Sequence, residues 1–174
     1  KSADTASSFM NLGIIEMQLG NYPESLELFL ESLAVFEAKN DSFNVAQVHS
    51  NLGTLYKNMY DYVTAEHSYK LALGYYQLNG LQLVQSKTHN NLGLLYFLKG
   101  QTDTAFFHFN RSLQIIENIG SNQDLWAPLL NLGYYNYEAT NYEQAESYLF
   151  KAYSESQNIG SIEGMCLSKI HLAL

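Results

Sequence analysis

Proline, cysteine and positive charge are all scarce in this sequence. Its 174 residues include 2 Pro, 1 Cys and 9 Lys or Arg against 17 Asp or Glu, which gives a formal net charge of −8. A single cysteine excludes an internal disulfide and a cysteine-rich metal site. Because the few cations are scattered singly, they form no basic stripe, and we expect neither nucleic acid nor an anionic membrane as a direct partner.

Long apolar runs are missing as well. No segment approaches the ~20 consecutive apolar residues that a membrane-spanning helix needs, and no signal peptide is visible. With one thiol and no leader pattern, a reducing, cytoplasmic location is the expectation. The sequence starts without an initiator Met and stops inside an apolar pattern, so we expect it to be part of a longer protein. The hydrophobic share of 47% is typical of a folded chain with a sizeable core.

The most regular feature is an internal repeat of 40 residues. The tripeptide Asn11-Leu12-Gly13 returns at 51–53, 91–93 and 131–133. Large residues recur with it at one later position: Phe29, Tyr69, Phe109 and Leu149. The sequence therefore predicts a single repeat domain over 1–174, divided into 1–40, 41–80, 81–120, 121–160 and a partial repeat, 161–174.

The apolar residues within each repeat follow helical spacing. They return every three or four residues, stop near the middle of the repeat, and then resume with the same period. This pattern predicts two amphipathic helices per repeat and an all-α fold. Good N-cap residues, Asn21, Asp61 and Asn141, precede three of the second helices, and Pro128 confines the start of the seventh helix to about 125–127. The expected helices are about 4–19, 22–38, 44–59, 62–78, 84–99, 102–118, 125–139, 142–158 and 162–174.

These residues resemble the tetratricopeptide repeat. Leu12-Gly13 matches the Leu-Gly pair of that family. The other matches are the first-helix tyrosines Tyr56 and Tyr96, the second-helix alanines Ala65, Ala105 and Ala145, the aromatics Phe29 and Phe109, and the last alanines Ala72 and Ala152. The resemblance covers the whole chain. It implies a right-handed α-solenoid of antiparallel helix pairs, with four repeats and the first helix of a fifth.

Two features depart from the usual family pattern. The period is 40 residues, whereas the usual family period is about 34. The closing proline is also replaced, by Glu37, Gln77, Glu117 and Gln157. With both departures, the chain resembles a long subclass of the family that has extended second helices. Similar repeats are found in kinesin light chain, Pins-type spindle scaffolds, Rap-type regulators and bacterial signalling proteins.

The repeated glycine needs an explanation, because glycine inside a helix costs roughly 0.5–1 kcal/mol relative to alanine. The resemblance implies that each of these glycines faces the small residue of the paired helix. The expected partners of Gly13, Gly53, Gly93 and Gly133 are Ser25, Ala65, Ala105 and Ala145. Without a β-carbon, the two helix backbones could approach closely.

In the family, the first helices of the repeats line a concave face, so the resemblance implies a binding groove for a protein or peptide segment. The expected groove residues are Asn11, Asn51, Asn91, Asn131, Lys57, Lys87, Leu94, Phe97, Leu98, Leu130, Tyr134 and Tyr137. The four asparagines form a ladder whose amides offer donors and acceptors to the backbone of an extended peptide. The alternative is that the same amides bond to a neighbouring helix or to their own turn.

The expected groove is also asymmetric, since its first half is polar and its second half is apolar. Leu94, Phe97, Leu98, Leu130, Tyr134 and Tyr137 would form the apolar strip. Exposed apolar strips mark binding sites. The alternative is that the ninth helix, or a further repeat beyond Leu174, covers them.

Residues that support catalysis or cofactor binding are not evident. His49, His67, His89, His108 and His171 never stand at ligand spacing with a cysteine or carboxylate. His49 and His89 share one repeat position, yet packed or surface histidines are the expectation there. Cys166 is expected to be a buried, unreactive thiol. The chain is therefore expected to have no enzymatic activity, no metal and no cofactor.

The leading hypothesis is a protein- or peptide-binding module that acts as the sensory or scaffolding part of a larger signalling protein. That placement rests on analogy with similar repeats. The alternative hypothesis is self-association into a homo-oligomer through the open end of the array at Leu174.

Overall fold

The computed structural model describes residues 2–172, and within that range all regular secondary structure is helical. The chain divides into two compact units, Lys1–Leu81 and Gln82–Leu174. We call them the N-terminal half and the C-terminal half. Each half contains its own helix pairs and its own buried residues, so the predicted all-α fold is confirmed.

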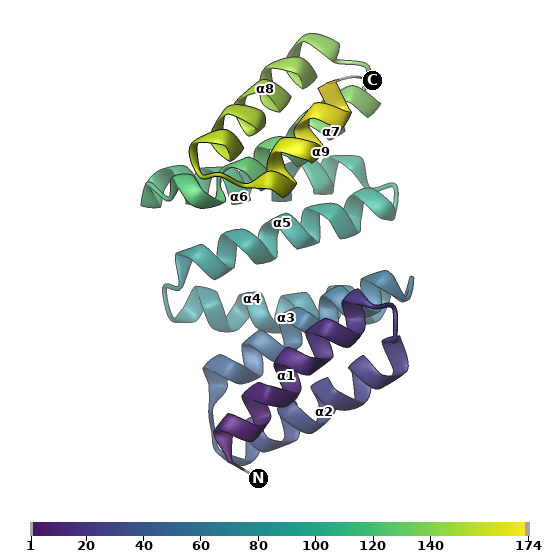
Figure 1. The fold of residues 1–174 in the computed structure, drawn as a ribbon, viewed down its shortest axis with the longest axis vertical. Coiled ribbons are helices and arrows are strands. Elements are labelled where there is room, and N and C mark those ends of the chain that lie inside the picture. The colour runs from purple at the N-terminus through teal and green to yellow at the C-terminus, as the bar shows by residue number, and fades with distance from the viewer. Residues whose placement is uncertain (1, 173–174) are drawn as a thin grey trace. The chain divides into compact units, whose positions relative to one another are not determined.

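The N-terminal half contains two helical hairpins (Figure 1). Its helices are α1 (Ala3–Gln18), α2 (Tyr22–Ala38), α3 (Ser42–Asn58) and α4 (Tyr62–Leu78). Helix α1 packs on α2, α3 packs on α4, and α2 packs on α3. This is the stacking of consecutive helix pairs that the repeat predicts.

The C-terminal half repeats the pattern with one addition. Its elements are α5 (Gln82–Leu98), α6 (Thr102–Ile119), the short 3₁₀ helix η1 (Asn122–Asp124), α7 (Trp126–Glu138), α8 (Tyr142–Asn158) and α9 (Ile162–Leu172). Here α5 packs on α6, α6 on α7, α7 on α8, and α8 on α9. Pro128 lies in the first turn of α7, as predicted. Residues 173 and 174 of the expected ninth helix lie outside the described residues.

Left-handed residues separate the helices at a fixed interval. The break positions with positive φ are Gly20, Asn40, Tyr60, Gly80, Gly100, Gly120, Thr140 and Gly160. At the first of these breaks, the backbone amide of Asn21 donates a hydrogen bond to the carbonyl of Glu16 at 2.9 Å. That bond satisfies a carbonyl that the end of α1 would otherwise leave unpaired.

Side-chain capping explains only some of the helix starts. Asp61 accepts a hydrogen bond from the Thr64 amide, as predicted. Asp41 does the same for Asn44, which the sequence analysis missed. Asn21 and Asn141 make no side-chain cap bond, so their predicted capping role is wrong.

The repeated glycines face a different residue from the one expected. A β-carbon added to Gly53 would lie 2.6 Å from Cδ1 of Tyr69, and one added to Gly93 would lie 2.5 Å from Cδ1 of Phe109. The large side chain, and not the expected small residue, therefore occupies the space directly beside the glycine. Each glycine provides room for the large side chain four residues further along the second helix. In the first repeat the expected small residue also contacts the glycine, because Ser25 Oγ donates a hydrogen bond to the Gly13 carbonyl at 2.8 Å.

The cores lie between the paired helices and between successive pairs. In the N-terminal half the core cluster is Ala6, Phe29, Phe36, Val48, Leu52 and Leu55. In the C-terminal half a cluster joins Leu129, Leu130, Leu149 and Ala152. Buried serine hydroxyls also bond across a helix pair, for example from Ser32 Oγ to the Ala6 carbonyl at 2.8 Å. This packing fixes the first helix of each repeat against its paired second helix. The candidate site lies on these first helices.

Candidate functional site

In the C-terminal half, three side-chain contacts connect α5 with the segment formed by η1 and α7. Lys87 on α5 forms an ion pair with Asp124 of η1, at 3.0 Å between Nζ and Oδ1. One turn further along α5, Asn90 accepts a hydrogen bond from Asn131 of α7 at 2.8 Å. Phe97 then packs against Tyr134 with ring centroids 5.4 Å apart. We call these residues, together with Asn91, the α5–α7 face.

The first part of this face is polar and hollow. A cavity of about 320 Å³ is lined by Ser86, Lys87, Asn90, Asn91, Ser112, Asp124, Trp126, Ala127 and Pro128. Its lining combines a cation, a carboxylate and two amides with the apolar surfaces of a tryptophan and a proline. Such a mixture can bind a side chain of either polarity while fixing the position of a backbone beside it.

The asparagines of the C-terminal half have two different environments. Asn131 donates to Asn90, so its amide bonds to a neighbouring helix, which is the alternative that the sequence left open. The half-buried side chain of Asn91 has no hydrogen-bond partner among the described residues. Its donors and acceptor therefore remain available to a ligand.

The other part of the α5–α7 face is aromatic. Tyr134 lies between Phe97 and His171 of α9, whose ring centroid is 5.1 Å away in an edge-on arrangement. Burial, followed by the charge of Glu138, raises the pKa of the Tyr134 hydroxyl, so it remains a neutral donor at physiological pH. Leu98, which follows Phe97 at the end of α5, is 54% exposed. These side chains offer flat and apolar surfaces to a partner.

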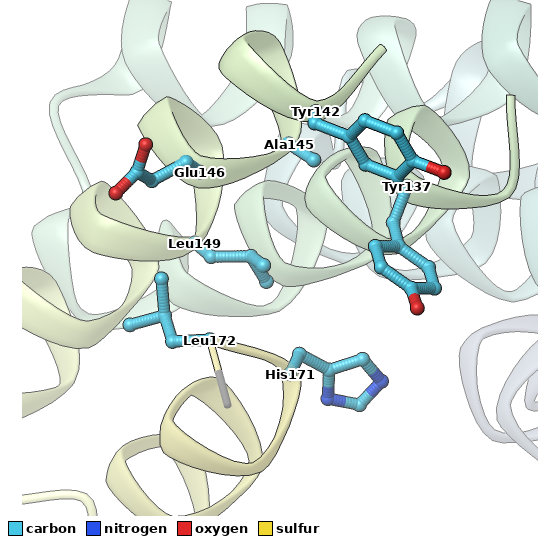
Figure 2. Close-up of a pocket in the computed structure, with 7 residues that line it drawn as sticks. All are labelled: Tyr137, Tyr142, Ala145, Glu146, Leu149, His171 and Leu172. Atoms are coloured by element: carbon cyan, nitrogen blue, oxygen red, sulfur yellow. The ribbon is translucent and has the colours of Figure 1, made fainter. Parts of the chain in front are cut away.

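A second cavity, of about 370 Å³, lies where α7, α8 and α9 meet. Figure 2 shows Tyr137 and Tyr142 on one side of it and His171 and Leu172 of α9 on the other, with Leu149 between them. The two tyrosine rings contact each other edge-on, with centroids 5.7 Å apart. The predicted residue Tyr137 therefore lines a cavity, and Tyr142 is a neighbour that the sequence analysis did not identify.

In the N-terminal half the predicted residues occupy α1 and α3. Asn11 is exposed, and Asn51 is half-buried with no hydrogen-bond partner among the described residues. Lys57 is half-buried near the end of α3, and burial lowers the pKa of its ammonium group. Within the described chain no carboxylate forms an ion pair with it. A partly desolvated cation of this kind favours an anionic ligand group.

Two sequence-based expectations fail here. Leu130, which was expected on the apolar strip, is only 8% exposed and packs with Leu129 and Leu149 in the core. It is buried because α7 packs on α8 and because Leu167 and Leu172 of α9 also pack against this cluster. For Leu130, coverage by the ninth helix was the alternative that the sequence left open. Cys166 was expected to be buried, yet its side chain is exposed on α9.

The site also includes residues that the sequence analysis did not select. Asp124 is part of the site because η1 places it beside Lys87. His171 is part of it because α9 places its ring against Tyr134. One sequence feature could have indicated this site. Asn90 directly precedes Asn91, and no other repeat has an amide at the position before the repeated asparagine. Contacts between residues so far apart in the sequence leave no local pattern.

No group of three or more metal-ligating side chains occurs among the described residues. None of the helices in that range is long and apolar enough to span a membrane.

Comparison with known proteins identifies the repeat. The tetratricopeptide repeat pattern matches residues 4–77 and 84–154, which is most of the chain. The chain therefore belongs to the tetratricopeptide repeat family. A relative among characterised proteins is the human nuclear autoantigenic sperm protein, with 28% identity over 108 residues, covering 59% of this chain and 14% of that protein.

The fold is shared by many solved structures, of which two are compared. The Bacillus subtilis aspartyl phosphate phosphatase F superposes with a TM-score of 0.91 at 16% identity, over 100% of this chain and 46% of that one. A Rap protein in complex with competence and sporulation factor superposes with a TM-score of 0.84 at 14% identity, over 94% of this chain and 46% of that one. The chain thus spans about half the length of each, and likeness at these identities concerns the fold alone.

Proposed function

We propose that this chain is a non-catalytic binding module that holds an extended protein or peptide segment against the first helices of its repeats. The observation that carries this proposal is the α5–α7 face. It combines the open amide of Asn91, a cavity of about 320 Å³ with one ion pair at its edge, and the aromatic side chains of Phe97 and Tyr134. Amides can bond a ligand backbone, while the cavity and rings take alternate side chains.

Further support comes from the N-terminal half. The open amide of Asn51 lies at the same repeat position as Asn91. Lys57 adds a half-buried cation that has no carboxylate partner among the described residues. The fold is also that of a Rap protein that was solved in complex with competence and sporulation factor. In this proposal the chain is the sensory or scaffolding part of a larger signalling protein.

Selection followed by site-specific crosslinking tests this function. A library of random linear peptides is selected against the immobilised chain, and a photo-crosslinking phenylalanine analogue is placed at Phe97 or, as the control, at Phe107. Phe107 is 60% exposed on the second helix α6, so it is accessible yet outside the α5–α7 face. The proposal expects crosslinking of the selected peptides at Phe97. Crosslinking at Phe107 alone, or selection of no peptide, would contradict it.

Self-association is the second candidate. The end of the array at Leu174, where the sequence suggested it, lies outside the described residues, but α1 carries an exposed apolar surface. Leu12, Ile15 and Leu19 are 43%, 50% and 68% exposed. The residues equivalent to the first two on α3, Leu52 and Leu55, are 4% and 0% exposed because they pack in the core with Phe36 of α2. Light scattering of the parent and of an Ile15→Gln variant tests this candidate: a dimer that the substitution dissociates supports it, and a parent that is monomeric at all concentrations rules it out.

A further inference from the structure

Two histidine rings meet in the C-terminal half, away from the α5–α7 face. Nδ1 of His89 on α5 lies 2.9 Å from Nδ1 of His108 on α6, and the ring centroids are 5.1 Å apart. The pair is 19 residues apart in the sequence, so it joins the two helices of one hairpin. His89 is only 5% exposed.

The surroundings hold both rings in place. Tyr96 of α5 stacks on His108 with centroids 5.2 Å apart and planes 16° apart. Phe107 also contacts His108, edge-on, with centroids 5.3 Å apart. Because both rings are packed, a rotation of either ring away from the other when its charge changes would cost packing energy.

The bond between these nitrogens accommodates a single proton. One Nδ1 must donate and the other must accept, so the acceptor has to stay unprotonated at that atom. When both rings are fully protonated, two N–H groups and two positive charges face each other across a distance of 2.9 Å. For His89, which is almost fully buried, an imidazolium whose Nδ1–H faces another N–H is unfavourable.

We propose that the His89–His108 pair is an acid-sensitive latch, which holds α5 against α6 near neutral pH and releases them when His89 takes up a proton. This inference does not depend on the proposed ligand. Asn90 and Asn91 directly follow His89 on α5, so release would also displace the amides of the α5–α7 face; that consequence alone rests on the proposed function.

The charges around the pair agree with this direction. Burial, then the charge of His108, then that of Arg111 on α6 lower the pKa of His89 from its usual 6.5 to about 4. On α5 itself the nearby titratable groups are Tyr96 and Lys99, whose ammonium lies 5.2 Å from the centroid of the Tyr96 ring. Helix α7 also packs on α5, but its tyrosines Tyr134 and Tyr135 face Phe97 and Phe106 instead.

The sign of the pH dependence follows from the two pKa values. The folded state releases the His89 proton at about 4, and the unfolded state does so near 6.5, so between them the unfolded state binds more protons. Stability is therefore complete above about 6.5 and is lost as the pH falls towards 4. For this group alone, the unfolding equilibrium constant of the C-terminal half rises about twentyfold from about pH 7 to about pH 5.

A single tryptophan makes this change measurable in the correct half. Trp126, the only tryptophan of the sequence, lies on α7, so its fluorescence reports denaturant unfolding of the C-terminal half. The variant His89→Asn places a neutral amide close to the position of Nδ1. The variant His67→Asn removes an exposed histidine from the N-terminal half and is the matched control.

The experiment compares how the folded-to-unfolded ratio of each protein changes between about pH 7 and about pH 5. If the latch exists, this ratio falls about twentyfold more in the parent and in His67→Asn than it does in His89→Asn. Equal losses in all three proteins would overturn it. If His89→Asn does not fold, the NMR titration of His89 in the parent decides: a midpoint near 4 supports the latch, and an ordinary midpoint near 6.5 overturns it.

Discussion

The ring of Tyr69 occupies the space that a β-carbon on Gly53 would need, with Cδ1 at 2.6 Å from that position. The same relationship recurs between Gly93 and Phe109 at 2.5 Å and between Gly133 and Leu149 at 2.6 Å. Four copies of a poor helix residue are thus retained because each one admits a large, fully packed side chain from the paired helix.

This relationship predicts opposite effects for two glycine-to-alanine changes in the same hairpin. Gly53→Ala pushes a methyl group into Tyr69 and lowers the free energy of unfolding by about 1–3 kcal/mol. Gly74→Ala, on α4, adds a methyl group with no described atom within 4 Å, and it raises that free energy by about 0.5–1 kcal/mol because alanine favours the helix. Thermal unfolding followed by circular dichroism measures both. Equal effects of the two changes would contradict the packing role of Gly53.

The break residues give a second prediction. Thr140 has φ of 62°, a left-handed conformation that is unfavourable for a β-branched residue. Thr140→Gly should therefore raise the free energy of unfolding by roughly 0.5–1 kcal/mol. The reverse change, Gly100→Thr, at φ of 72°, should lower it by about 1–2 kcal/mol. Urea unfolding followed by Trp126 fluorescence tests the pair, and a destabilised Thr140→Gly would refute the strain.

The position of Lys57 predicts that its replacement raises the stability of the fold and weakens the binding of acidic peptides. Burial lowers the pKa of its ammonium, which means that the folded state disfavours the charged form. Lys57→Met should therefore raise the free energy of unfolding by roughly 0.5 kcal/mol. It should also weaken the binding of peptides that carry a carboxylate, because the cation that would pair with it is gone. Lys151→Met, at an exposed position of α8, is the control and should change neither; an unaltered affinity of Lys57→Met for acidic peptides would exclude this role.

The sequence predicted the helices well, because each helix is specified by a local period and by local end signals. All nine helices begin and end within about two residues of the expected positions up to Leu172. The partner of the glycine was predicted wrongly, because the choice between Ala65 and Tyr69 depends on how closely two helices approach. No spacing within a single helix contains that information.

The site was less predictable for the same reason. Leu130 belongs to the periodic apolar pattern, and only the packing of α7 with α8 and α9 decides that it faces the core. The contact of His89 with His108 crosses a hairpin, and the contact of Tyr134 with His171 connects helices from different repeats. Such pairs depend on tertiary distances, which the sequence specifies only through the complete fold.

The most direct test of the account is the binding of a selected peptide by two double variants, measured by isothermal titration calorimetry. One variant carries Asn51→Ala and Asn91→Ala, which removes the two open amides. The other carries Asn79→Ala and Asn110→Ala, whose amides bond the carbonyls of Tyr75 and Phe106 within the second helices. We expect the first variant to bind at least about tenfold more weakly than the parent, with unchanged melting, since each amide contributes about 1 kcal/mol. We expect the second to keep the parental affinity. Parental affinity in the first variant would contradict the account.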